Sequence, residues 1–198
     1  MEFPESTREV RENHRFDVAA LDRWWTEAVG AHEGLTVRQF KGGQSNPTFW
    51  IHDGTRATVL RKKPPGALLH KAHMVEREYQ IMRALAPTDV PTAKMLALCE
   101  DAEVIGTPFF VMEHLDGRIF WNVQLPGLEP AARTAIYEEL ARVLAALHSV
   151  DPDAVGLDGF GRKGGYVVRQ VARWTKQYDA SRADENAEGS ANFMDALI

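Results

Sequence analysis

Three kinds of residue follow one another between positions 42 and 78, and their order constrains this chain more than any other feature. A Gly-rich turn lies between two predicted strands and consists of Gly42, Gly43, Gln44, Ser45 and Asn46. Val59 and Arg61 then share one face of the next strand, because side chains alternate along a strand. A helix that carries Glu76 and Glu78 follows.

This order predicts a site for the phosphates of a nucleotide. Backbone N–H groups of a Gly-rich turn can approach phosphate oxygens. An apolar residue two positions before a cation suits ATP, since Val59 would cover the base while the guanidinium fork of Arg61 meets phosphate oxygens. Each element also has a plainer interpretation: Gly-Gly pairs are common in hairpins, and Arg61-Lys62-Lys63 could be an exposed strand end.

Composition narrows the class of protein. The chain has 198 residues, a net charge of -5 and no basic run, so we expect no nucleic-acid partner. Cys99 is the single cysteine, which excludes an internal disulfide and favours a reducing compartment, with the thiol buried rather than nucleophilic. The charged N-terminus has no apolar core of a signal peptide, and no segment approaches a membrane span. We expect a cytoplasmic protein.

The first 115 residues predict an α+β unit. Residues 1–16 are polar and are expected to be extended or loosely held. Asp17 can cap a helix whose apolar face is Leu21, Trp24, Trp25 and Ala28. Strands are expected at 36–40, 48–52, 56–62, 95–100 and 108–115, with a two-residue hairpin turn at Asp53-Gly54 and a short acidic turn between the last two strands. A helix over 70–85 should pack on this five-stranded antiparallel sheet.

The rest of the chain is predicted to be mainly helical. Pro130 suits the first turn of a helix that ends near His148, with an apolar stripe of Ile136, Leu140, Val143, Leu144 and Leu147. A Gly- and Asp-rich loop follows over 151–165. A second helix over 167–178 should point Val168, Val171 and Trp174 inward.

Five segments together resemble a known family. GGQSNPTFWI, VLRKKPPG, VEREYQIMRAL, PFFVMEHLDGR and LARVLAALHSVD occur in the order and spacing of the aminoglycoside phosphotransferase (APH)-like kinases. YVVRQVARWTKQY and FMDALI are most similar to the branch found beside acyl-CoA dehydrogenase domains. The resemblance covers about residues 30–198 and implies a protein-kinase-like fold with two lobes.

The resemblance also implies a division of the chain and roles for single residues. Residues 1–34 would be an N-terminal extension and helix, 35–116 the small, nucleotide-binding lobe with a hinge at 113–117, and 118–198 the incomplete start of the large lobe. Arg61 would take the place of the strand lysine of such kinases and pair with Glu78, with Glu76 as the alternative. Met112 would wall the back of the base pocket, and the backbone of Glu113 and Leu115 would bind the base of ATP, with GTP as the alternative nucleotide.

One departure from the family pattern concerns catalysis. Such kinases use a loop resembling H-G-D-x-x-x-x-N and a later metal-binding Asp, to orient the substrate hydroxyl and hold Mg²⁺. Neither motif is in the printed sequence, and we interpret Asp158-Gly159-Phe160-Gly161 as a turn. We therefore expect no catalytic residue and no metal ligand in this chain, which would be a kinase cut before its catalytic loop.

Two functions remain open at this point. The chain is expected to be the nucleotide-binding portion of an enzyme that transfers the γ-phosphate of ATP to a hydroxyl of a small molecule; alternatively, it is a non-catalytic nucleotide-binding or regulatory module. The expected partners are the nucleotide, the small hydroxylated substrate in the full-length protein and a second copy of the chain in a homo-oligomer. The resemblance names a fold rather than a substrate.

Overall fold

The computed structural model describes residues 3–42, 45–66 and 73–182. The chain forms two compact units, residues 1–155 and 156–198, and each is described by itself. The expected lobe boundary at 113–117 stays a prediction, since this division into units does not test it.

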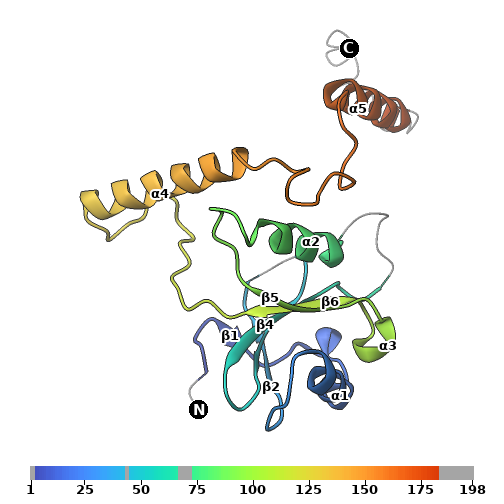
Figure 1. Cartoon of the computed structure of the whole chain (residues 1–198), viewed down its shortest axis with the longest axis vertical. Coiled ribbons are helices and arrows are strands. Elements are labelled where there is room, and N and C mark those ends of the chain that lie inside the picture. Colours follow the sequence, from blue (N-terminus) through green and yellow to red (C-terminus); the bar gives the residue numbers. More distant parts are fainter. Residues whose placement is uncertain (1–2, 43–44, 67–72, 183–198) are drawn as a thin grey trace. The chain divides into compact units, whose positions relative to one another are not determined.

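A six-stranded antiparallel sheet forms the centre of the first unit, in the order β1-β2-β3-β4-β6-β5 (Figure 1). The strands are β1 Thr7–Arg8, β2 Thr36–Phe40, β3 Thr48–His52, β4 Ala57–Lys62, β5 Met95–Cys99 and β6 Phe109–Glu113. Every neighbouring pair is antiparallel. The predicted α+β class and the five antiparallel strands from β2 to β6 are therefore confirmed.

Of the two expectations for the N-terminal residues, the extended conformation is the one observed around β1, and this segment is not loosely held. Thr7 and Arg8 lie opposite Phe40 and Gln39 of β2, and this pairing adds a sixth strand. The next backbone bond is donated by the Lys41 N–H to the Ser6 carbonyl, over 2.9 Å. A backbone ladder needs no apolar side chains, so the polar sequence of this segment did not reveal the strand.

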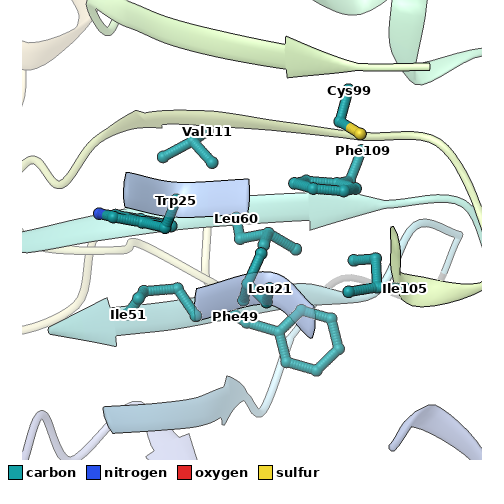
Figure 2. Close-up of a cluster of buried hydrophobic side chains, with 9 residues drawn as sticks. All are labelled: Leu21, Trp25, Phe49, Ile51, Leu60, Cys99, Ile105, Phe109 and Val111. Atoms are coloured by element: carbon teal, nitrogen blue, oxygen red, sulfur yellow. The ribbon is translucent and has the colours of Figure 1, made fainter. Parts of the chain in front are cut away.

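The two faces of the sheet carry different helices. Figure 1 shows α2 on one face, with α1 and α3 on the other. Alternation along the strands sends Phe49, Leu60 and Phe109 toward α1, where they are fully buried. The core on that side, drawn in Figure 2, consists of Leu21, Trp25, Phe49, Ile51, Leu60, Cys99, Ile105, Phe109 and Val111.

Helix α1, Val18–Ala28, begins and packs as predicted. The Asp17 carboxylate caps it by accepting the backbone N–H groups of Ala19 and Ala20 over 2.9 and 3.1 Å. Leu21 and Trp25 are fully buried. Trp24 meets Phe109 edge to face, with ring centroids 4.7 Å apart, so the apolar face of the helix lies against the sheet.

The β3–β4 hairpin is present, but its connection spans residues 53–56 instead of two residues. The Asp53 carboxylate accepts the backbone N–H groups of Thr55 and Arg56 over 3.0 and 2.8 Å, which stabilises the longer turn. Gly54 has φ +91°, and a Cβ there would lie 2.9 Å from the Cβ of Glu33. Glycine is therefore required at this position for both conformation and space.

Helix α2, Val75–Leu85, packs on β5 and β6, where Tyr79 lies 6.0 Å from Phe110 between ring centroids. The predicted start at residue 70 falls in 67–72, outside the described residues, but residues 73 and 74 are not helical. His73 has φ +58°, a left-handed conformation that cannot continue into a helix. The expected acidic turn contains a further short helix, α3 Ala102–Ile105, which ends at Gly106 with φ +83°.

A 3₁₀ turn, η1 Glu12–His14, precedes α1. Two longer helices follow β6. Helix α4, Pro130–His148, matches its predicted bounds, and α5, Tyr166–Arg182, is longer than expected at both ends. Val168, Val171 and Trp174 of α5 are 74%, 59% and 56% exposed, so the expectation that they point inward is wrong for the described residues. Helical periodicity defines an apolar face but does not identify what covers it. In the described part of the chain, no helix is long and apolar enough to cross a membrane.

Candidate functional site

A hollow of about 680 Å³ lies on the α2 side of the sheet, between strands β2, β3, β4 and β6 and the segment that follows β6. Val59 and Met112, which are cross-strand partners, contribute apolar side chains to it. His114 and Phe40 both line the hollow, and their rings stack with centroids 6.3 Å apart and planes inclined by 17°. The other lining residues are Phe3, Pro4, Ser6, Thr48, Ala93, Glu113, Leu115, Asp116, Gly117, Arg118 and Ile119.

Four residues predicted to bind the base therefore line one hollow: Val59, Met112, Glu113 and Leu115. The backbone N–H of Glu113 donates to the Lys94 carbonyl over 2.9 Å, and its carboxylate accepts the Lys94 N–H over 2.7 Å. This N–H is thus occupied within the protein. A base in the hollow would have to use the Glu113 carbonyl and the backbone of Leu115.

The predicted contact between the strand cation and the helix carboxylate is present. Arg61 Nε lies 2.9 Å from Glu78 Oε2, and the two side chains are 34% and 36% exposed. The alternative partner, Glu76, instead forms an ion pair with Lys63. Since Arg61 and Lys63 are two residues apart, two cation–carboxylate pairs join β4 and the residue that follows it to α2.

Asn46, the last residue of the Gly-rich turn, connects this turn to α2. Its side chain is buried, and its amide donates to Glu78 Oε1 over 2.9 Å. Its Oδ1 lies 2.9 Å from Nδ1 of His73, just before the helix. Glu78 therefore meets both Arg61 and Asn46, so turn, strand and helix converge on one carboxylate.

The remaining residues of the Gly-rich turn are placed less fully. Gly42 lies against the ring of Trp121, because a Cβ at Gly42 would be 3.2 Å from the Trp121 Cη2 atom. Ser45 is exposed. Gly43 and Gln44 lie outside the described residues, so the role of this turn at phosphates stays a prediction.

The polar contacts between the Gly-rich turn, the end of β4 and α2 include two residues for which the sequence predicted no such contact, Lys63 and His73. Lys63 could have been found, because alternation places its side chain on the same face as that of Arg61. Glu76, the partner of Lys63, lies half a helical turn before Glu78. His73 could not have been found, because its contact with Asn46 joins positions far apart in the sequence. Among the described residues, no group of three or more His, Cys, Asp or Glu could hold a metal ion.

The arrangement suits a ligand with a flat apolar ring and an anionic tail. On one face of β4, Val59 lies in the apolar hollow and Arg61 lies two residues further along, about 7 Å away. The carboxylate of Glu78 and the buried amide of Asn46 hold the arginine side of the site. An antiparallel sheet, one packed helix, a strand–helix ion pair and a hollow at the following linker together fit the kinase-like fold that the sequence predicts.

Comparison with known proteins gives the family. The model of the APH phosphotransferase enzyme family matches residues 36–198, so the chain belongs to this family. A crystal structure described as a "putative aminoglycoside phosphotransferase" from Ralstonia eutropha has 49% sequence identity and a TM-score of 0.76, covering 92% of this chain and 52% of that one. The kinase-like fold expected from the sequence is thereby confirmed.

Two curated relatives are acyl-CoA dehydrogenase family members, in agreement with the predicted branch. Member 11 of Rattus norvegicus is 47% identical over 202 residues, which cover 100% of this chain and 25% of the relative. Member 10 of Mus musculus is 48% identical over 178 residues, which cover 89% and 17%. The chain thus spans about a quarter or less of the curated relatives it matches.

Proposed function

We propose that this chain is the nucleotide-binding portion of an ATP-dependent kinase that phosphorylates a hydroxyl group of a small molecule. The base of ATP, or of GTP as the alternative, would lie in the hollow between Val59, Met112 and Leu115. The Glu113 carbonyl and the Leu115 backbone would bind its polar edge. Arg61 and the turn at residues 42–46 would meet the phosphates.

One observation carries this proposal: Arg61 is held by Glu78, and Glu78 is also bound by Asn46 of the Gly-rich turn. A guanidinium held in this way is ordered before a ligand arrives, so less conformational entropy is lost when phosphate binds. Val59 places the apolar hollow on the same face of β4. An ion pair that only joined α2 to the sheet would not need an apolar hollow beside it on the same face of β4.

The transfer step requires groups beyond those of this chain. In this class of reaction a metal ion neutralises phosphate charge and an aspartate orients the attacking hydroxyl. The printed sequence holds no H-G-D loop for these tasks. We propose that the longer protein supplies the loop and the Mg²⁺ ligands, and that this chain alone binds nucleotide without transferring phosphate. An aminoglycoside is one candidate acceptor among small hydroxylated molecules.

Calorimetric titration tests the nucleotide site. Wild-type protein should bind ATP and adenosine, and Arg61→Ala should weaken ATP binding about tenfold or more while leaving adenosine binding unchanged, because a charge-assisted contact to phosphate is lost. Arg142→Ala is the matched control, since Arg142 pairs with Glu139 on the exposed surface of α4. Equal ATP affinity of wild type and Arg61→Ala would contradict the assignment of Arg61 to phosphates.

A transfer assay with labelled ATP and a panel of hydroxylated compounds tests the reaction. A protein extended through the expected catalytic loop should transfer phosphate, and the 198-residue chain should not. Turnover by the short chain at the rate of the extended one would show that the catalytic groups lie within it. Nucleotide binding by both proteins with transfer by neither would favour the alternative, a non-catalytic nucleotide-binding module.

A further inference from the structure

The residues before β2 form part of the hollow that the proposed function assigns to the base. Phe3, Pro4 and Ser6 line it together with Val59 and Leu115. The family match begins at residue 36, so this wall lies outside the part of the chain that the family model describes. The alignment with the rat protein, in contrast, includes the whole chain.

The segment is fixed to the sheet by a series of hydrogen bonds. Beyond the β1–β2 pairing, the Pro4 carbonyl accepts both the backbone N–H of Thr7 over 2.9 Å and its hydroxyl over 2.7 Å, which makes a tight turn over residues 4–7. Arg38 Nε donates to the Thr7 hydroxyl over 3.0 Å. These bonds give residues 3–8 a defined position beside β2 rather than that of a trailing end.

Phe3 is placed by its own ring contacts. The guanidinium carbon of Arg38 lies 4.3 Å from the centre of the Phe3 ring, and Trp50 meets the same ring edge to face at 6.1 Å. Even so, 44% of the Phe3 surface is exposed, and the residue is one of those that line the hollow. An aromatic ring oriented by two neighbours and left partly uncovered offers apolar surface to a ligand.

We infer that Phe3 binds the nucleotide directly: its ring covers the base and ribose end, while Arg61 acts at the phosphate end. The inference rests on the proposed function. The physical basis is position: Phe3 shares the hollow with Val59 and Leu115, whereas Arg61 is not among the residues that line it. Contact with Phe3 would remove apolar surface of both ring and base from water.

Three probes separate the two ends of the nucleotide: adenosine, ATP and inorganic tripolyphosphate. In calorimetric titrations, Phe3→Ala should weaken adenosine and ATP binding by the same factor, about fivefold, and leave tripolyphosphate binding unchanged. Phe3→Leu keeps apolar bulk and should fall between wild type and Phe3→Ala. It also serves as the test variant if Phe3→Ala does not fold. Val18→Ala is the control, because Val18 is an apolar residue of similar exposure, 39%, outside the hollow.

The outcomes distinguish this inference from the proposed function. Wild type that binds no nucleotide overturns both. Wild type that binds ATP while the Phe3 variants bind it equally well, or more tightly, overturns the role of Phe3 alone. A loss that includes tripolyphosphate would show that the Phe3 variants disturb the lobe as a whole, which also overturns the inference.

Discussion

The ion pair between Arg61 and Glu78 can be tested by Glu78→Gln, which removes the charge but keeps an oxygen that can accept the Asn46 amide. Arg61 Nε and Glu78 Oε2 lie 2.9 Å apart, and the strength of their attraction depends on how far water screens the two charges. Each side chain is about one third exposed. Fully exposed pairs contribute about 0.2–1 kcal/mol, because water screens them and two side chains must be ordered. For this more covered pair we expect about 1 kcal/mol, or about fivefold in the unfolding equilibrium constant.

Urea unfolding of wild type, Arg61→Ala, Glu78→Gln and the double variant gives the coupling energy directly. Glu139→Gln is the control, since Glu139 also pairs with an arginine but both side chains are more than half exposed, at 58% and 53%. It should cause no measurable change. The same proteins titrated with ATP should show weaker binding for Glu78→Gln, because Arg61 is no longer held in place.

A coupling energy below about 0.3 kcal/mol would refute the reasoning, since it would place the pair at the low end of ordinary surface pairs. A stronger coupling of Arg61 to Glu76 than to Glu78 would refute it in another way. It would mean that the helix carboxylates exchange partners in solution.

Three further predictions concern the core. Leu60→Ala should destabilise the first unit by about 2–5 kcal/mol in urea unfolding, because Leu60 is fully buried; a loss below 1 kcal/mol would mean that the core collapses around the gap. Burial lowers the pKa of Lys62 below its ordinary value of 10.5, so Lys62 loses its proton at a lower pH in the folded state than in the unfolded state. The free energy of unfolding should therefore rise with pH between the lowered pKa and 10.5. Lys62→Met should abolish this rise in thermal melts, and an unchanged pH profile would contradict it. Burial raises the pKa of the Cys99 thiol, so a thiol reagent should modify native protein slowly and urea-unfolded protein fast; equal rates would contradict its burial.

The sequence predicted those parts of the fold that depend on local chemistry. Alternation of apolar residues identified five of the six strands, and the side chain of Asp17 identified the start of α1. Alternation also placed Arg61 on the same strand face as Val59. Its pairing with Glu78 was implied by the resemblance to the APH-like kinases, and the structure confirms that contact. The strands and the start of α1 were predicted from side-chain periodicity and from a cap within a few residues.

The parts that were not predicted depend on contacts between distant segments. Strand β1 is short and polar, so its pairing with β2 leaves no pattern in the sequence. The start of α2 was predicted too early, because the left-handed backbone at His73 is not apparent from helix-compatible neighbours. The polar contact between Asn46 and His73 likewise follows from the fold and not from spacing.

The contribution of α1 to the core has a consequence for where this domain can be divided. Helix α1 precedes residue 36, where the family match begins, yet it supplies Leu21 and Trp25 to the buried cluster. A boundary drawn from family similarity therefore passes through the hydrophobic interior. A protein that begins at residue 36 would retain the motifs of the family but would expose Phe49, Leu60 and Phe109 to water. We expect such a protein to aggregate. The segment that matches the family model and the segment that builds the buried core therefore begin at different residues.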